Sequence, residues 1–203
     1  MSEPFNPLDK ENLGKSVARA MLATEATPLA GLEPFNGAGI YALYYTGDFP
    51  AYAPIASRNR DGAFQVPIYV GSAVPPGGRR GGFGMQPGTH TKLFSRLNKH
   101  AQSITQAENL DLADFHCRYL LVDDIWIPLG ESLLITLHCP LWNQKLDGFG
   151  NHDPGRGRYN QLRSLWDVVH PGREWAGRCA ERTETSEQII ADIESYLRTY
   201  NFS

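Results

Sequence analysis

The stretch from Gly39 to Tyr45, Gly-Ile-Tyr-Ala-Leu-Tyr-Tyr, constrains the fold more than any other part of the chain. It is short, apolar and rich in residues that favour strands, and turn-forming sequence lies on both sides of it. A second run of this kind, Pro-Ile-Tyr-Val-Gly, ends at Gly71. We therefore expect two adjacent strands, joined by a long connection with room for an irregular turn or a short helix.

The size and composition of the chain indicate one cytoplasmic domain. Its 203 residues, 41 % of them apolar, are enough for a single core. No stretch approaches the roughly 18 uninterrupted apolar residues of a membrane span, so no membrane partner is expected. The N-terminus has neither the basic start nor the apolar stretch of a secretion signal. Three widely spaced cysteines fit reduced thiols in a cytoplasm.

The charges are unevenly distributed along the chain. The net charge of −3 disfavours nonspecific nucleic-acid binding. However, no Asp or Glu occurs from Gly62 to Ala107, where several Arg and Lys residues lie, whereas acidic residues gather in the last 25 positions. The sequence thus predicts one basic and one acidic face, although ordinary charge clustering explains the same pattern.

Helices are expected on both sides of the strands. Apolar residues at helical spacing predict a helix opening at residues 7–9 and helices over residues 93–104 and 128–137. A capping box of Thr185 and Gln188 begins the last helix. The stripes expected to be buried include Leu13, Val17, Ala20 and Met21 in the first helix and Leu129, Leu133, Leu134 and Leu137 in the third.

A third strand is expected over residues 115–122. Together these elements predict an α/β (α+β) fold, in which a small mixed sheet of three strands is flanked by helices. We expect a single domain over residues 1–203. Its core would span residues 36–146, with an N-terminal helical extension over 1–35 and a C-terminal extension of loop and helix over 147–203.

Six polar side chains occur in order along the chain, the first five on predicted strands and helices and the sixth after the last of these helices. They are Tyr41, Tyr69, Arg96, His100, Glu131 and Asn143. Arg96 and His100 are four residues apart on one helix, so they share a face. Taken singly, each of the six is explained by ordinary structure, such as a core tyrosine or a solvated helix charge. The order in which they occur is more informative.

This ordered set resembles the GIY-YIG nuclease superfamily, whose defining triplets appear as Gly39-Ile40-Tyr41 and Tyr69-Val70-Gly71. Most of residues 36–180 is similar, more closely, to the small dimeric Type II restriction enzymes of this superfamily that cut CCGCGG. The similar segments include residues 37–47, 67–71, 140–143, 147–152 and 166–175. Two departures from the usual superfamily form are shared with the restriction branch: widely separated triplets, and His100 where many relatives have tyrosine.

The resemblance implies a Mg²⁺-dependent site-specific endonuclease that hydrolyses phosphodiester bonds in double-stranded DNA at a short palindromic GC-rich site. Glu131 would hold one Mg²⁺, or a substituting Mn²⁺, largely through waters. Arg96 would pair with the scissile phosphate through its planar fork. Tyr69 would position the water or the phosphate, and Asn143 would anchor the site by hydrogen bonds.

Tyr41 would orient or deprotonate the attacking water. A phenol with an ordinary pKa near ~10 is a poor base at neutral pH. We therefore expect His100 to accept its proton and nearby cations to favour the phenolate.

A palindrome presents two equivalent scissile phosphates, so a two-fold homodimer is expected. Cations in two glycine-rich basic segments and their neighbours are candidates to contact the DNA. They are Arg79, Arg80, Lys92, Lys99, Lys145, Arg156 and Arg158. A cognate DNA methyltransferase is expected to protect host sites, with no direct contact implied. A flexible linker is the competing interpretation of the first basic segment, over residues 75–91.

Two other functions fit the same residues. One is a repair or homing-type nuclease of this superfamily, which usually carries a separate DNA-binding domain. The other is a protein of the same fold that binds DNA without cutting it. Such a protein would be expected to lack Glu131 or Arg96, and both are present.

Overall fold

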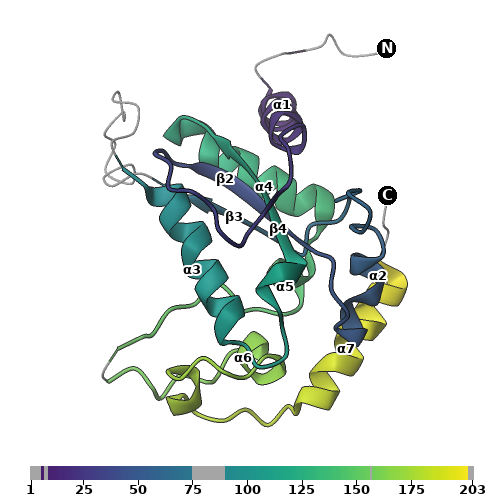
Figure 1. The fold of residues 1–203 in the computed structure, drawn as a ribbon, viewed down its shortest axis with the longest axis vertical. Coiled ribbons are helices and arrows are strands. Elements are labelled where there is room, and N and C mark those ends of the chain that lie inside the picture. Colours follow the sequence, from purple (N-terminus) through teal and green to yellow (C-terminus); the bar gives the residue numbers. More distant parts are fainter. Residues whose placement is uncertain (1–5, 7–8, 75–89, 156, 201–203) are drawn as a thin grey trace.

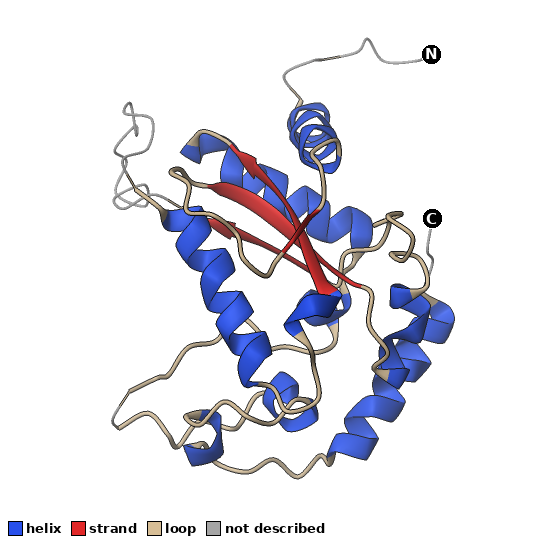
Figure 2. Cartoon of the chain, viewed as in Figure 1, coloured by secondary structure: helices blue, strands red, loops and turns tan. Residues whose placement is uncertain are grey.

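The computed structural model describes residues 6, 9–74, 90–155 and 157–200, so the predictions for Arg79, Arg80 and Arg156 lie outside the described residues. At its centre is a four-stranded sheet in the order β1-β4-β2-β3, shown in red in Figure 2. The strands are β1 (Thr27–Pro28), β2 (Gly39–Tyr45), β3 (Tyr69–Ala73) and β4 (Phe115–Leu121). Its three strand pairs are all antiparallel.

The mixed α/β class is confirmed, but the prediction of three strands in a mixed sheet was wrong. The fourth strand, β1, has two residues and pairs with β4 at the edge of the sheet. Two residues are too few for an alternating pattern, and the proline in β1 fits an edge position, because it lacks a hydrogen-bond donor. The three longer strands had been expected from their composition.

The central strand β2 is buried along its whole length because both faces of the sheet are covered. Tyr41, Leu43 and Tyr45 belong to one core cluster, whereas Ile40, Ala42 and Tyr44 belong to another. This alternation is the two-residue period of a strand. A strand covered on both faces shows no polar alternation, which explains the continuous apolar run in the sequence.

Helices cover the two faces. The α-helices of the described residues are α1 (Lys10–Leu22), α2 (Ala53–Ala56), α3 (Lys92–Gln106), α4 (Ile127–His138), α5 (Leu141–Gln144), α6 (Leu165–Val169) and α7 (Ser186–Thr199). Apolar side chains of α3 pack with Tyr41 and Leu43, while those of α1 and α4 pack with Ile40 and Ala42. Figure 1 shows α3 and α4 on either side of the strands. The long connection from β2 to β3 contains the short 3-10 helix Pro50–Tyr52 followed by α2.

The buried face of α1 differs from the predicted stripe. Ala20 is exposed, whereas Gly14 and Ala18 are buried beside Met21. A Cβ at Gly14 would lie 3.1 Å from the Leu133 side chain of α4. Small residues thus let the two helices approach closely, and a search for large apolar residues misses such a face. No helix among the described residues is both long and apolar enough to cross a bilayer.

The end of α4 is also more exposed than predicted. Leu137 is 52 % exposed, and Ile127, Gly130 and Leu134 form the buried face. The helix ends one residue later, where Cys139 adopts the left-handed conformation. The predicted capping box of α7 is confirmed, with Thr185 and Gln188 bonded reciprocally.

Candidate active site

Tyr41 and His100 form a buried hydrogen-bonded pair, with 2.5 Å between the Tyr41 hydroxyl and His100 Nε2. Tyr41 is fully buried on the central strand, and His100 is 2 % exposed on the sheet-facing side of α3. This hydrogen bond therefore links β2, which carries the Gly39-Ile40-Tyr41 triplet, to α3.

The Tyr41 ring can lie across β3 because Gly71 has no side chain. Tyr41 and Gly71 are partners in the β2–β3 register. A Cβ at Gly71 would lie 2.7 Å from the Tyr41 ring carbon that bears the hydroxyl, and closer still to the hydroxyl itself. Gly71, the last residue of the second triplet, must therefore lack a side chain for the Tyr41 ring to fit.

Gly71→Ala should therefore displace the Tyr41 hydroxyl and lower activity more than stability. We expect about a 10²-fold loss of single-turnover DNA cleavage, since misplacement of a reacting group by about 1 Å has that effect. Gly177→Ala is the control, because a Cβ at Gly177 meets no atom within 4 Å. Cleavage by Gly71→Ala at the rate of the Gly177→Ala control would refute this account of the glycine.

Burial keeps both members of the pair neutral. It raises the pKa of Tyr41 well above its ordinary value, and nearby Tyr69 raises it further, although Arg96 lowers it. Burial also lowers the pKa of His100 well below its usual range, and the positive charge of Arg96 lowers it further. We had expected nearby cations to favour the Tyr41 phenolate, and this was wrong. Arg96 does lower the pKa of Tyr41, but desolvation raises it by more.

Arg96 and Tyr69 lie on the open side of this pair. The Tyr69 ring centroid is 6.2 Å from that of Tyr41. Burial raises the pKa of Tyr69, and the Arg96 guanidinium lowers it. A Cβ at Gly150 would lie 3.0 Å from Arg96 Nη2 and 3.1 Å from the Tyr69 hydroxyl, so both groups face this glycine.

Glu131 reaches the same site from the other face of the sheet. It lies on α4, and its Oε2 accepts a 2.8 Å hydrogen bond from the Ser72 hydroxyl on β3. Its carboxylate is close enough to raise the pKa values of Tyr41 and Tyr69. This approach is possible because β3 is an edge strand.

The donor set fits Mg²⁺ held largely through water. Glu131 supplies one half-buried carboxylate beside a hydroxyl. Among the described residues, no group of three or more His, Cys, Asp and Glu could hold a metal. Mg²⁺ keeps several waters and is often bound by one or two carboxylates together with substrate phosphates, so a single carboxylate suits it.

Asn143 braces the second triplet. Its side-chain oxygen accepts from the Val70 amide at 2.8 Å, and its nitrogen donates to the Val70 carbonyl at 2.9 Å. These two bonds occupy the backbone of β3, which pairs with β2 alone within the part of the chain that the structure describes. The predicted anchoring contact is therefore made to the backbone between Tyr69 and Gly71.

The chain matches the model of the Eco29kI GIY-YIG domain over residues 33–197. The chain belongs to this restriction endonuclease family. Membership shows a restriction-type nuclease, with DNA as the substrate. A comparison with curated proteins finds no match.

The match to the Eco29kI family includes residues that the site prediction omitted. His152 Nε2 lies 2.8 Å from Arg96 Nη1, and Phe149 stacks on His100 with ring centroids 4.5 Å apart. Residues 147–152 were noticed as part of the resemblance, but a glycine-rich loop gives no periodic signal that would place it against a helix 50 residues earlier.

The candidate DNA contacts lie in three places. Lys92 and Lys99 are exposed on α3, at helical spacing from Arg96, so this helix carries a row of cations. Arg158 is exposed in the loop after His152. Lys145 lies over the Tyr196 ring of α7, 5.4 Å from its centroid. The structure thus brings Lys145 against the C-terminal helix.

Proposed function

We propose that this chain is a Type II restriction endonuclease that cuts double-stranded DNA at a short palindromic GC-rich site, CCGCGG, with one Mg²⁺ per active site. The observation that carries the proposal is the Tyr41–His100 hydrogen bond, with Arg96 beside both tyrosines. Family membership supplies the reaction class, and this geometry supports roles for the residues in phosphodiester hydrolysis.

Arg96 is the phosphate-binding group of the proposal. It lies close enough to Tyr41 and Tyr69 to lower the pKa of both phenols, and it is only partly buried. A guanidinium is always charged and presents parallel N–H donors that match two phosphate oxygens. It would hold the scissile phosphate next to the Tyr41 hydroxyl and stabilise the negative charge that develops there.

Tyr41 and His100 act as a proton relay in this proposal. Because burial disfavours both the phenolate and the imidazolium, neither charge is formed in advance. As water attacks phosphorus, its proton passes to the Tyr41 oxygen while the Tyr41 proton passes to His100 Nε2. The positive imidazolium forms together with the added negative charge on the phosphorane, so that the two charges offset each other. The P–O bond to the leaving sugar oxygen then breaks, and that oxygen takes a proton from water.

Glu131 would hold the Mg²⁺, and Ser72 would fix the orientation of the carboxylate. When bound, the ion supplies Lewis-acid stabilisation to the phosphate oxygens. Asn143 would hold the strand between Tyr69 and Gly71 in place. Tyr69 would position the phosphate or the water on the open side of Tyr41.

The proposed enzyme works as a two-fold homodimer, since a palindrome offers two equivalent phosphates. The exposed cations along α3, together with Arg158, would follow the DNA backbone or contact guanine edges. A cognate methyltransferase would protect the host's own copies of the site.

Incubating the purified chain with plasmid DNA and Mg²⁺, followed by sequencing of the ends, tests this function. We expect discrete fragments whose ends share CCGCGG, and no cleavage in EDTA. Nicks that depend on DNA structure would indicate a repair-type nuclease. A shifted but intact plasmid would indicate a protein that binds without cutting, and either result would overturn the proposal.

A further inference from the structure

We propose that His152 is a positioning residue, which fixes the Arg96 guanidinium in the orientation that receives the phosphate. This inference rests on the proposed function for the identity of the phosphate. The contact that carries it is the 2.8 Å hydrogen bond between Arg96 Nη1 and His152 Nε2. A guanidinium can only donate, so Nε2 must be the unprotonated, accepting nitrogen of a neutral imidazole.

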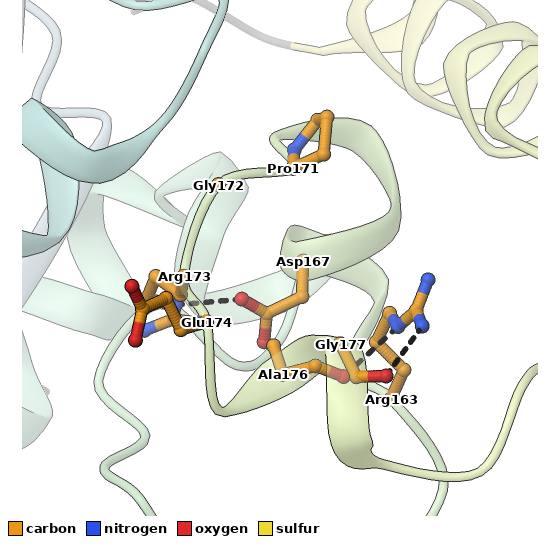
Figure 3. A pocket seen from close by; sticks show the side chains of 8 residues that line it. All are labelled: Arg163, Asp167, Pro171, Gly172, Arg173, Glu174, Ala176 and Gly177. Atoms are coloured by element: carbon orange, nitrogen blue, oxygen red, sulfur yellow. Dashed lines mark hydrogen bonds and ion pairs between the residues drawn. The ribbon is translucent and has the colours of Figure 1, made fainter.

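A buried arginine, Arg173, hydrogen-bonds to the backbone of the loop that carries His152. Arg173 donates to the carbonyls of Gly148, Phe149 and Asn151, at 2.9, 3.1 and 3.3 Å respectively. The same guanidinium pairs with Asp167 at 2.6 Å, and both side chains are 1 % exposed. Figure 3 shows this ion pair beside Arg163, which donates to the carbonyls of Ala176 and Gly177.

Aromatic packing fixes the position of Arg173 in turn. Its guanidinium carbon lies 4.5 Å from the Trp166 ring centroid and 4.8 Å from that of Trp175. Because each of its three guanidinium nitrogens donates a hydrogen bond, Arg173 constrains where the three loop carbonyls lie. His152 follows directly after the last of them, so its position on the surface is set by a buried cation.

The loop also meets the other active-site residues. Phe149 stacks on His100 with ring planes 16° apart and packs edge-on against Tyr69. Gly150 leaves the space that the Arg96 fork and the Tyr69 hydroxyl occupy. Residues 148–152 therefore form one wall of the site, and His152 is the member of that wall that bonds Arg96.

The Arg96–His152 hydrogen bond orders the Arg96 side chain before DNA binds. An arginine side chain has four flexible bonds, and ordering it only when DNA arrives would weaken its alignment with the phosphate. His152 is exposed and bonds Nη1 of the guanidinium, whereas Tyr41 and Tyr69 interact with the same guanidinium inside the site. We therefore expect the Arg96–His152 contact to lower the free energy of the transition state, in which the guanidinium must be aligned with the phosphate.

His152→Ala and His152→Gln test the proposal together. The amide oxygen of Gln can accept the Arg96 N–H in place of Nε2, whereas Ala cannot. We expect His152→Ala to lower the single-turnover rate at saturating CCGCGG duplex by about 10- to 100-fold, with the Kd for DNA in Ca²⁺ changed less than about threefold. His152→Gln should recover most of the rate. His138→Gln, at the other end of α4 from Glu131, is the control and should cleave normally.

A second readout does not depend on cleavage. In ¹⁵N-arginine-labelled protein without DNA, the Arg96 guanidinium protons should exchange with water faster in His152→Ala than in the wild type and in His152→Gln. Their signal is assigned from its loss in Arg96→Lys. Unchanged exchange, or equal loss of rate and of Tm in both His152 variants, would overturn the positioning role. Absence of cleavage by the wild type would instead overturn the proposed function, and the exchange rates would still decide the Arg96–His152 contact.

Discussion

Glu131→Gln should lower single-turnover DNA cleavage by about 10³-fold or more while DNA binding survives. Gln has nearly the same shape and can keep the hydrogen bond from Ser72, but it removes the only negative charge that we assign to the metal. Loss of the charge that stabilises a phosphoryl-transfer transition state has effects of about this size. Rates measured over a Mg²⁺ titration, and affinity measured by fluorescence anisotropy of labelled duplex, separate the two effects.

Arg96→Ala provides the companion result in the same assays. It should also lose about 10³-fold in rate, because the phosphate then lacks its bidentate donor. Its rate should stay low at every Mg²⁺ concentration, because the lost side chain is assigned to the phosphate and not to the metal. A Glu131→Gln or Arg96→Ala enzyme that cleaves at the wild-type rate would remove that residue from the catalytic centre.

Arg173→Ala should destabilise the protein by about 3–5 kcal/mol, the usual effect of removing one partner from a buried ion pair. It leaves the Asp167 carboxylate, 1 % exposed, without its cation. It also leaves the carbonyls of Gly148, Phe149 and Asn151 without this donor. Urea unfolding followed by tryptophan fluorescence and by far-UV circular dichroism measures the loss.

Lys15→Ala is the control for this experiment. Lys15 pairs with Glu11 on the exposed surface of α1, where solvent screening leaves little net stabilisation. Its unfolding midpoint should stay close to that of the wild type. An equally small shift for Arg173→Ala would mean that the buried pair does not hold the loop of residues 148–152.

The sequence was enough to predict the strands and helices that carry most of the site, but not the short helix α5 that carries Asn143. Gly39–Tyr45 is bounded in the structure as its composition indicated, and the helix bearing Arg96 and His100 extends the predicted one by a turn or less at either end. These segments are predictable because their signals are local: a run of strand-forming residues, or apolar residues at helical spacing. The contact between Tyr41 and His100 came instead from the family resemblance, which supplied tertiary information.

The wall formed by residues 148–152 could not be predicted in this way. Its position depends on Arg173, a charged residue that is buried only because Asp167 and three carbonyls meet it. Charged residues are ordinarily expected at the surface. The protonation state of Tyr41 was likewise outside the reach of sequence, because desolvation of the pair depends on complete burial, which a strand pattern does not quantify.

The central claim is that the Tyr41 hydroxyl, bonded to His100, takes part in the reaction. Its most direct test is the single-turnover rate of Tyr41→Phe on a CCGCGG duplex in Mg²⁺, because this change removes one oxygen. The matched control is Tyr44→Phe, whose hydroxyl contacts Arg118 on the opposite face of the same strand. We predict a loss of about 10²-fold or more for Tyr41→Phe and a normal rate for Tyr44→Phe. A folded Tyr41→Phe enzyme that cleaves as fast as Tyr44→Phe would contradict the claim.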